Sequence, residues 1–231
     1  MKKIGILGGI GPESTVDYYK EIISAFNNQY KELAYPEIII YSANLNELMA
    51  LVNSKNWSQL IDWLLDKINS LHNSGAEFAA IASNTPHFVY DKLKNKSPIP
   101  IISIVESTCS EAKKLDLKKP GLLGTKLTME SDFYMKPFIK NSIPIIVPSE
   151  SEQMLIHHKL FSEIELGIFK DSTKKELLSI IERMIIEDKI DSIILGCTEL
   201  PLILTKNTYE IPFLNTTAIH CKSIIEYCLR S

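Results

Sequence analysis

The sequence predicts an α/β fold made of two similar Rossmann-like domains with mostly parallel sheets. Two observations lead to this prediction. Short, apolar, β-branched runs alternate with longer stretches whose apolar residues recur at helical spacing, a pattern typical of parallel strands joined by helices. Three short stretches also occur twice, and the distance between the two copies stays nearly constant: residues 2–9 with 118–125, 17–19 with 132–134, and 83–85 with 196–198. This repetition favours an internal duplication that relates the two domains by a pseudo-twofold axis.

The first domain is expected to comprise residues 1–98 and 208–231. Apolar runs predict strands, and helical periodicity together with start signals predicts the helices between them. Pro12 suits a first helical turn, and the glycines before it let the backbone approach a ligand, so the exposed amides of this turn are expected to hold an anion. The expected elements are strands at 4–7, 37–43 and 79–82, a polar loop at 44–47, and helices at 14–30, 57–72 and 86–93.

The second domain is expected to comprise residues 99–207. A strand after a proline-rich segment begins it, and the second copy of the N-terminal strand follows. Thr173 and Glu176 have the spacing of a capping box that starts a helix ending near residue 188. The strand near 211–213 and the helix at 218–229 are expected to return to the first domain. The other expected elements are strands at 101–105, 143–147 and 190–195, and helices at 107–115, 128–138 and 150–169.

The composition excludes several classes of partner. Lys and Arg total 25 against 28 Asp and Glu, so no basic face for nucleic acid is expected. No apolar run approaches the ~18 residues of a membrane span, and the N-terminus leads directly into a strand and does not resemble a signal peptide. The four cysteines have no CxxC spacing, and the adjacent His157 and His158 make a poor metal pair. We therefore expect a cytoplasmic, reduced protein without a metal ion.

Two strand ends carry the candidate site. Residues 195–201 (LGCTELP) follow a buried strand, so Cys197 is expected just past its carboxyl end, where open α/β sheets bind ligands. Residues 78–85 break in the same way into Ser83, Asn84 and Thr85. We expect these strand ends to face each other across one small-molecule site in the cleft between the domains.

The chemistry suggested by these residues is proton transfer. A cysteine at a helix N-terminus has a lowered pKa and can act as a base at neutral pH. Thr198 and nearby backbone amides could orient a carboxylate. Two such groups on opposite sides of a stereocentre could remove a proton from one face and return one to the other, which is racemisation without a cofactor.

Four motifs together resemble the aspartate/glutamate racemase family: residues 8–13 (GGIGPE), 83–87 (SNTPH), 123–125 (LGT) with 128–134 (TMESDFY), and 195–199 (LGCTE). The resemblance runs nearly end to end. It implies two Rossmann-like domains, no pyridoxal phosphate, no metal, usually a homodimer, and an amino-acid substrate whose proton is moved by a pair of cysteines. It implies Cys197 and Ser83 as the catalytic positions. It also implies that the substrate's carboxylates are held by turns that contain Asn84, Thr85, Thr125 and Thr198. We further expect Ile10, Gly11 and Glu199 among the substrate-binding residues, with helix capping or proton transfer near Cys197 as alternative roles for Glu199.

Two departures from the family pattern affect this interpretation. Ser83 stands where the family has its first catalytic cysteine, and a hydroxyl is a far weaker acid than a thiol with its pKa of about 8.5. The protein is then a natural variant with one strong base, an engineered Cys-to-Ser form, or an inactive relative. Residues 45–51 also offer no basic side chain for the distal carboxylate of an acidic substrate, which leaves aspartate, glutamate and a broader set open.

Three other functions are alternatives to racemisation. A single cysteine could protonate a carbanion on one face, as a decarboxylase of a malonate-type acid would require. The protein could also bind an amino acid without turnover. A dinucleotide-binding module is a third possibility, but the glycine-rich turn lacks the third glycine of the fingerprint. His87 is expected on the surface of the helix that follows Pro86.

Overall fold

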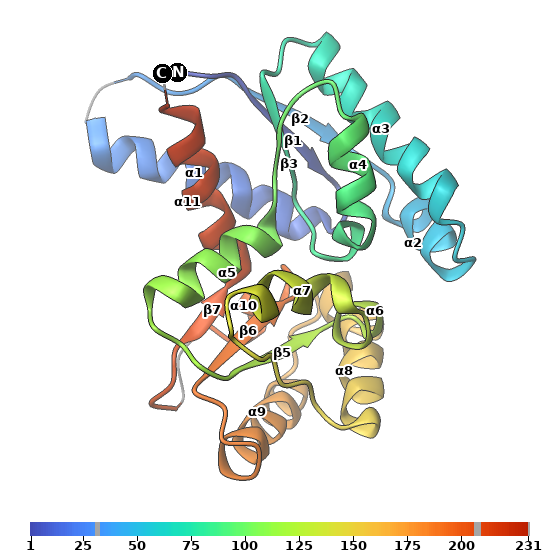
Figure 1. Cartoon of the computed structure of the whole chain (residues 1–231), viewed down its shortest axis with the longest axis vertical. Helices are drawn as coiled ribbons and strands as arrows, with labels where there is room; N and C mark the ends of the chain where they lie inside the picture. Colours follow the sequence, from blue (N-terminus) through green and yellow to red (C-terminus); the bar gives the residue numbers. More distant parts are fainter. Residues whose placement is uncertain (31–32, 206–208, 231) are drawn as a thin grey trace. The chain divides into compact units, whose positions relative to one another are not determined.

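The computed structural model describes residues 1–30, 33–205 and 209–230, and the chain divides into two compact units (Figure 1). Unit 1 is Met1–Ser107 with Thr217–Ser231, and unit 2 is Thr108–Thr216. Both junctions lie later in the chain than those expected from the sequence. Unit 1 is discontinuous, because the last helix of the chain belongs to it.

Unit 1 contains a four-stranded parallel sheet in the order β2-β1-β3-β4. The elements of this unit are β1 (Ile4–Gly8), α1 (Pro12–Tyr30), β2 (Ile38–Ser42), α2 (Leu45–Asn53), α3 (Trp57–Asn73), β3 (Phe78–Ile81), the 3₁₀ helix η1 (Thr85–Val89), α4 (Tyr90–Lys96), β4 (Ile101–Ile102), the start of α5 (Ile104–Lys114), and α11 (Thr216–Cys228).

Unit 2 contains a three-stranded parallel sheet in the order β5-β6-β7. The remaining part of α5 belongs to this unit. Its other elements are β5 (Pro120–Gly124), α6 (Lys126–Glu130), α7 (Asp132–Lys140), α8 (Glu150–Ser162), the 3₁₀ helix η2 (Ile164–Leu166), α9 (Asp171–Ile186), β6 (Ser192–Gly196), α10 (Leu200–Ile203) and β7 (Phe213–Asn215).

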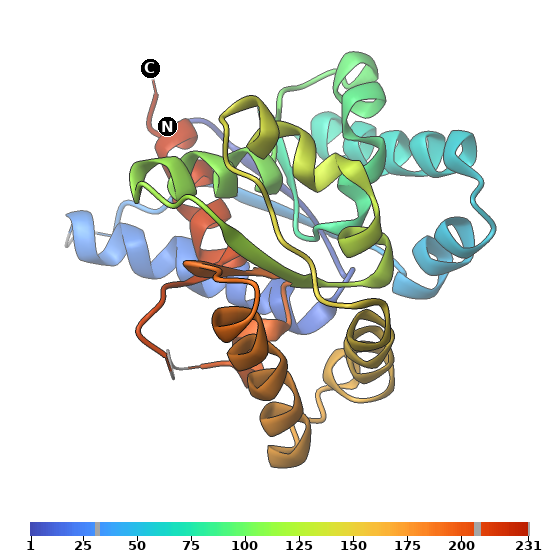
Figure 2. The ribbon, with the colours of Figure 1, turned by 60° about the horizontal axis from the view of Figure 1, so that its bottom comes forward.

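The core of unit 1 joins elements from both ends of the chain. Helices α1 and α11 lie side by side in both ribbon views and pack on one face of the sheet (Figures 1 and 2). Tyr18 of α1 is hydrogen-bonded through its hydroxyl to Nδ1 of His220 in α11, at 2.7 Å. The buried residues of this core are Ile4, Ile6, Tyr18, Ile22, Phe26, Phe78, Ala80, Ala82, Cys221, Ile224 and Cys228.

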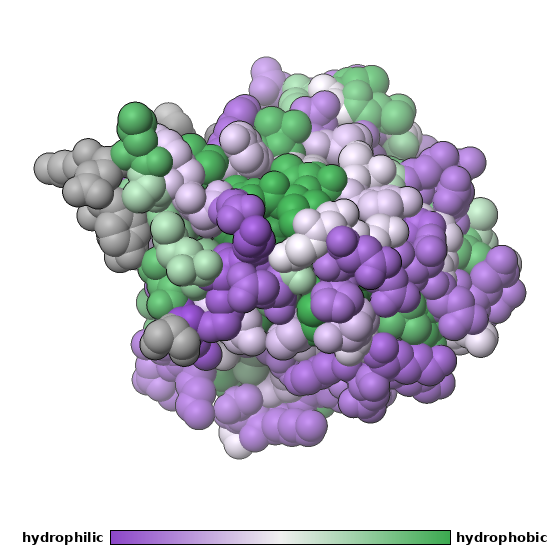
Figure 3. Space-filling view, turned by 90° about the horizontal axis from the view of Figure 1, so that it is seen from above, coloured by the Kyte–Doolittle hydropathy of each residue, from purple (hydrophilic) through white to green (hydrophobic). Residues whose placement is uncertain are grey.

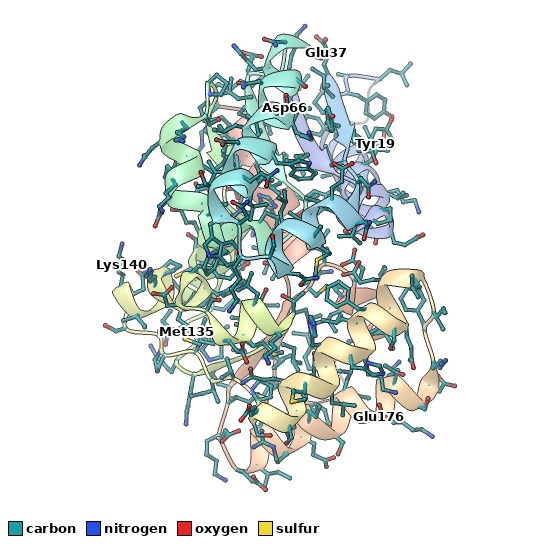
Figure 4. The ribbon with its side chains drawn as sticks, turned by 90° about the vertical axis from the view of Figure 1, so that its right-hand side faces the viewer. Tyr19, Glu37, Asp66, Met135, Lys140 and Glu176 are labelled. Atoms are coloured by element: carbon teal, nitrogen blue, oxygen red, sulfur yellow. The ribbon has the colours of Figure 1, made fainter. Side chains whose placement is uncertain are left out.

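The core of unit 2 lies between its sheet and helices α8 and α9, which run next to each other (Figure 2). Apolar residues recur at helical spacing on both helices and face β5 and β6. An ion pair joins the two helices, with Lys159 Nζ 3.0 Å from Glu176 Oε2; Glu176 is labelled in Figure 4. In the chain outside 31–32, 206–208 and 231, no helix is both long and apolar enough to cross a membrane.

The two sheets have the same strand order. In unit 2, Ile146 forms a parallel bridge to Gly121 on the side of β5 opposite β6. The order Ile146-β5-β6-β7 therefore matches β2-β1-β3-β4, with β5 and β6 as counterparts of β1 and β3. This match agrees with the duplication predicted from the repeated stretches.

The strand near 211–213 is a correction to the sequence analysis. We expected it in the first domain, but β7 pairs with β6 through Ile193, Ile194 and Leu195 and so completes the second sheet. The duplication explains this placement, because β7 takes the position that β4 has in unit 1. Only the helix after β7 belongs to unit 1.

Four smaller expectations about local structure are wrong. Residues 44–47 are not a loop, because the Asn44 side chain accepts a hydrogen bond from the Asn46 amide and caps α2. Strand β4 ends at Ile102 and a helix follows at once, and residues 143–147 contribute one bridge and no strand. Thr173 does not cap α9, since the helix begins at Asp171 and the Thr173 hydroxyl donates to Glu163.

Gly9 shows why the turn after β1 needs a glycine. Its φ is +78°, and an added Cβ would lie 2.3 Å from the carbonyl oxygen of Ala43. Gly75 has φ +101°, but a Cβ there would meet nothing within 4 Å. A substitution at Gly75 would therefore cause backbone strain alone, whereas one at Gly9 would add a steric clash with Ala43.

We predict that Gly75→Ala lowers the free energy of unfolding by about 1–2 kcal/mol, the cost of a left-handed alanine. Gly9→Ala should lower it by about 2–5 kcal/mol, because displacement of the Ala43 backbone adds to that cost. Urea unfolding followed by circular dichroism measures both. Equal losses for the two variants would contradict the steric argument.

Candidate functional site

The ends of β5 and β6 approach each other closely because each ends in glycine. Gly124 and Gly196 are partners in the parallel register. A Cβ on Gly196 would lie 2.7 Å from the carbonyl oxygen of Leu123, and one on Gly124 would lie 3.0 Å from the carbonyl oxygen of Gly196. The residues that follow, Thr125 and Cys197, are therefore presented from neighbouring positions at the carboxyl edge of the sheet.

Cys197 lies in a cluster of acidic groups. Its side chain is 6% exposed, and its thiol is 3.2 Å from Glu199 Oε2 and 3.3 Å from Glu165 Oε1. The Thr198 hydroxyl also donates to Glu199 Oε2, at 2.9 Å. Glu199 is 1% exposed, and its Oε1 has no hydrogen-bond partner within the described part of the chain. The predicted residues Cys197, Thr198 and Glu199 thus form one hydrogen-bonded group.

The charge state of Cys197 differs from the expectation. Burial, and then repulsion from Glu165 and Glu199, raise the pKa of the thiol well above its ordinary value. The expected lowering by a helix N-terminus is wrong, because α10 starts only at Leu200 and is a single turn. Cys197 is therefore a thiol in the resting site, and its proton must move before it can act as a base.

Glu165 is a site residue that the sequence analysis missed. It belongs to η2, far from every motif we identified, and no neighbouring sequence pattern marks it. Burial, and then repulsion from Glu199, raise its pKa to about 8, so the carboxyl group is largely protonated at neutral pH. Its role could have been predicted only with the knowledge that η2 packs against the loop after β6.

The three acids are spaced closely enough for a metal ion to be considered. One ligand atom each from Glu165, Cys197 and Glu199 lies within 4.8 Å of the others, and no second group of this kind occurs among the described residues. The contacts within the group are those of acids that share protons, with the single thiol proton placed to be donated to an oxygen of either Glu199 or Glu165. We assign no metal to them.

Thr125 has a structural role that the structure makes visible. As the N-cap of α6, its hydroxyl oxygen accepts a hydrogen bond from the Thr128 amide at 3.3 Å, and the two hydroxyls are 3.0 Å apart. This fixes Thr125 at the end of β5, next to the strand that carries Cys197. Capping accounts for its type at this position, and its place at the sheet edge keeps it a candidate for binding.

The unit 1 half of the predicted site follows β3. Ser83 is 8% exposed, and its amide donates to the carbonyl of Ile81 at 2.8 Å. Ser83 is not the cap of the next helix, because η1 has Asn84 as its N-cap residue. Asn84 and Thr85 are both buried directly after it. Capping of the following helix therefore does not explain the serine at this position.

The glycine-rich turn after β1 is held by its own side chains. The Gly9 amide donates to Thr15 Oγ1 at 2.9 Å, and the hydroxyls of Thr15 and Ser14 both donate to the carbonyl of Gly11. Ile10 is buried between them. The Gly9 amide is therefore not available to an anion, contrary to the expectation from the sequence.

His87 is buried, not on a helix surface as expected. It is 3% exposed, and its Nδ1 lies 3.0 Å from the carbonyl oxygen of Ser83, while its Nε2 has no hydrogen-bond partner within residues 1–30, 33–205 and 209–230. Burial lowers its pKa to about 4. Burial, and then the neighbouring His87, lower the pKa of His220 to about 3. His87 therefore supports the Ser83 turn in its neutral form.

The strand registers make Ser83 and Cys197 equivalent positions. Leu7 of β1 pairs with Ile81 of β3, and its counterpart in the repeat, Leu123 of β5, pairs with Leu195 of β6. Ser83 and Cys197 each follow two residues after these partners. The sequence match aligned Ser83 with Gly196, one residue away, because strand ends cannot be located from short polar matches alone.

Comparison with known proteins places this architecture in a family. The family model described as Asp/Glu/Hydantoin racemase matches residues 7–224. The broad specificity amino-acid racemase RacX of Bacillus subtilis is 27% identical over 225 residues, 96% of each chain. The crystal structure of an aspartate racemase homologue from Pyrococcus horikoshii is 35% identical with a TM-score of 0.85, and that of a candidate Asp/Glu racemase from Yersinia pestis is 30% identical with a TM-score of 0.89. Both alignments cover 100% of each chain.

We predict that stability falls as the pH drops from about 6.5 towards 5, before most carboxylates titrate. In the unfolded chain His87 and His220 bind protons near pH 6.5, but in the folded chain they do so only near 4 and 3. The unfolded state binds more protons in this window, so the free energy of unfolding decreases as the pH falls. Urea titrations at several pH values measure the slope.

His87→Gln should reduce this slope, because the amide can still donate to the Ser83 carbonyl but cannot titrate. His158→Gln is the matched control, since His158 is exposed. An unchanged slope in His87→Gln, or an equal reduction in both variants, would contradict the assignment.

Proposed function

The chain belongs to the Asp/Glu/Hydantoin racemase family, and we propose that it is an amino-acid racemase that works without a cofactor through Cys197 and the position of Ser83. The observation that carries the proposal is the equivalence of these two residues in the two sheets. Each copy of the duplicated fold has a proton-transferring group at the same position. This arrangement suits a reaction in which one group removes the α-proton from one face and the other group returns a proton to the opposite face. The proposal requires both turns to reach the same substrate.

The proposed reaction exchanges the proton on the α-carbon. The sulfur of Cys197 takes the proton from one face while its own proton passes to the neighbouring carboxylate, and the resulting carbanion takes a proton from the Ser83 side. Because a serine hydroxyl is a poor acid at neutral pH, the step on that side is slow, and one enantiomer is favoured. Cys197 must remain a free thiol, which suits the reducing cytoplasm.

The proposed substrate is an acidic amino acid, aspartate or glutamate. The turns after β1, β3, β5 and β6 supply the candidate binding residues, which are Ile10, Gly11, Asn84, Thr85, Thr125, Thr198 and Glu199. A broader substrate set is the second candidate. It is favoured by the lack of a basic side chain in 45–51, and one relative is named a broad specificity racemase.

A homodimer is part of the proposal, and a hollow on unit 1 lined by aromatic and aliphatic residues supports it. A cavity of about 230 Å³ lies between α1 and the edge strand β2. Tyr19, on its rim, is 48% exposed and is labelled near the margin of the view in Figure 4. Figure 3 shows a separate observation, a group of hydrophobic side chains bordered by hydrophilic ones on the face seen from above. The lining residues are Tyr19, Ile23, Tyr35, Pro36 and Ile38.

We predict that L- and D-aspartate and L- and D-glutamate, incubated separately in D₂O, exchange their α-proton at unequal rates, one enantiomer well above the other. Cys197→Ala should reduce exchange of every substrate by at least about 10²-fold, because it removes the base. Ser83→Cys should accelerate the slower direction by at least about tenfold, because it supplies a better acid. Proton NMR of the α-position measures all of these rates.

Three outcomes would contradict this assignment. Exchange that survives Cys197→Ala would remove the thiol from the reaction. Release of carbon dioxide from a malonate-type acid, without amino-acid exchange, would favour a one-cysteine decarboxylase. Binding of an amino acid without any exchange would indicate a catalytically impaired binder.

We predict that Tyr19→Glu converts a dimer into a monomer, because it places a charge in the hollow between α1 and β2 that we propose as the interface. Met154→Glu is the control, since Met154 is also exposed but lies on α8. Analytical ultracentrifugation measures the mass of each. A wild-type monomer, or a dimer that persists in Tyr19→Glu, would contradict this interface.

A further inference from the structure

A histidine on α8 holds the backbone that follows Thr125. The amide of Lys126, the first residue of α6, donates a hydrogen bond to Nδ1 of His157 at 3.2 Å. The first amides of a helix have no partner inside it, so they must be satisfied from outside. Helix α6 lies next to α8 (Figure 1), and the imidazole supplies this partner from there. The peptide bond between Thr125 and Lys126 is therefore held by a side chain of another helix.

His157 is itself well anchored. Its ring lies 4.8 Å from the ring of Phe161, one turn further along α8, in a T-shaped arrangement. On the same helix, Ile156 and Leu160 are fully buried in the core of unit 2. The acceptor atom is therefore carried by a helix that is fixed in the core independently of α6.

The hydrogen bond fixes the protonation state of the imidazole. Because an amide can only donate, Nδ1 of His157 must be the unprotonated nitrogen, and the proton of the neutral ring lies on Nε2. An imidazolium carries a proton on both nitrogens, so protonation removes the acceptor and turns two hydrogens towards each other. Burial, and then the charge of Lys126, lower the pKa of His157 below its ordinary value of 6.5. The neutral, accepting form therefore predominates at neutral pH.

The charged groups near this ring come from α6 and α8. Lys126 and Glu130 face it from α6, and His158 faces it from its own helix. Lys126 Nζ lies 3.5 Å from Glu130 Oε1, so the two charges partly offset each other. Among the described residues, the other elements that pack on α8, which are β5, η2 and α9, add no further charge to this group. The protonation of His157 therefore depends on pH and on α6.

We propose that His157 is a positioning residue that holds the Thr125 turn in the geometry that binds the substrate. It acts on a substrate only through the backbone at Lys126. The register of β5 and β6 places Thr125 beside Cys197, so a displaced turn weakens substrate binding and leaves proton transfer by the thiol largely intact. The role in binding rests on the proposed function, but the support of the turn by His157 does not.

The first test needs no substrate. Full-length protein with isotope-labelled lysine and histidine is titrated from about pH 5 to about pH 8, and the amide signal of Lys126 is identified as the one missing in Lys126→Arg. In the wild type this signal and the ring signals of His157 should follow one titration curve, because protonation of the ring removes the acceptor of the amide. The midpoint should lie below 6.5.

Two variants of nearly equal shape isolate the acceptor atom. In His157→Asn the side-chain oxygen stands as many bonds from the backbone as Nδ1, so the Lys126 amide should keep an acceptor and no longer titrate. In His157→Leu the acceptor is absent, so the amide signal should lie at every pH near the acid limit of the wild type. His158→Asn is the control, since His158 is exposed on the same helix, and it should match the wild type.

The second test separates binding from turnover, by measuring α-proton exchange against amino-acid concentration. In the wild type KM should rise as the pH falls through the titration of His157, and in His157→Asn it should stay nearly constant. At neutral pH His157→Leu should raise KM about three- to tenfold, with kcat within about twofold, which corresponds to the loss of one neutral hydrogen bond. In a Thr125→Ala background the same substitution should change KM little, because its effect passes through that turn.

Each outcome decides between the proposals. A Lys126 amide signal that does not titrate in the wild type, or that is unchanged in His157→Leu, would overturn the inference, whatever the activity. Equal changes of KM in His157→Asn and His157→Leu, or a fall in kcat at constant KM, would also overturn it.

The expected titration, together with no exchange of any amino acid by the wild type, would retain the support of the turn by His157 and overturn the racemase function. If His157→Leu does not fold, the wild type and His157→Asn decide alone. Coinciding pH profiles of the Lys126 amide in these two proteins would then overturn the inference.

Discussion

The close pairing of β5 with β6 is the constraint on which the functional half of unit 2 depends. Glycines at 124 and 196 allow the two strand ends to meet where any side chain would separate them. This pairing fixes the depth at which the next residue, Cys197, enters the protein. A thiol three residues further along would lie in α10, and one residue earlier it would be inside the sheet. The position of the sulfur is therefore determined more by the register of β5 and β6 than by the loop that contains Cys197.

That depth has a chemical effect. A thiol beside two carboxylates in a mostly buried place cannot be a permanent anion, since like charges in low dielectric repel strongly. Its reactivity depends on which of its neighbours holds a proton at a given moment. The reactive unit is then a group of acids that exchange protons with one another. In the part of unit 1 that the structure describes, Ser83 has no acidic hydrogen-bond partner.

Most of the architecture can be predicted from the sequence, because the local periodicity of apolar residues indicates the strands and the amphipathic helices. The duplication also identified both strand ends that carry Ser83 and Cys197. What could not be predicted depends on contacts between distant segments: β7 joining the second sheet, His87 buried behind the Ser83 turn, and Glu165 beside the thiol. The sequence analysis also missed the start of α2, which is set by the Asn44 side chain as its N-cap. The predicted lowering of the Cys197 pKa was wrong for the same reason, because burial and the distant Glu165 raise that pKa.

The return of α11 to unit 1 has a consequence for the order in which the chain can mature during synthesis. All of unit 2 is translated before residues 217–228 emerge, so its hydrophobic interior can close while the first sheet still lacks a covering helix. Until then the apolar faces of Tyr18, Ile22 and Phe26 have no Cys221, Ile224 or Cys228 against which to settle. The sheet of unit 1 therefore stays partly uncovered until residues 217–228 have been synthesised.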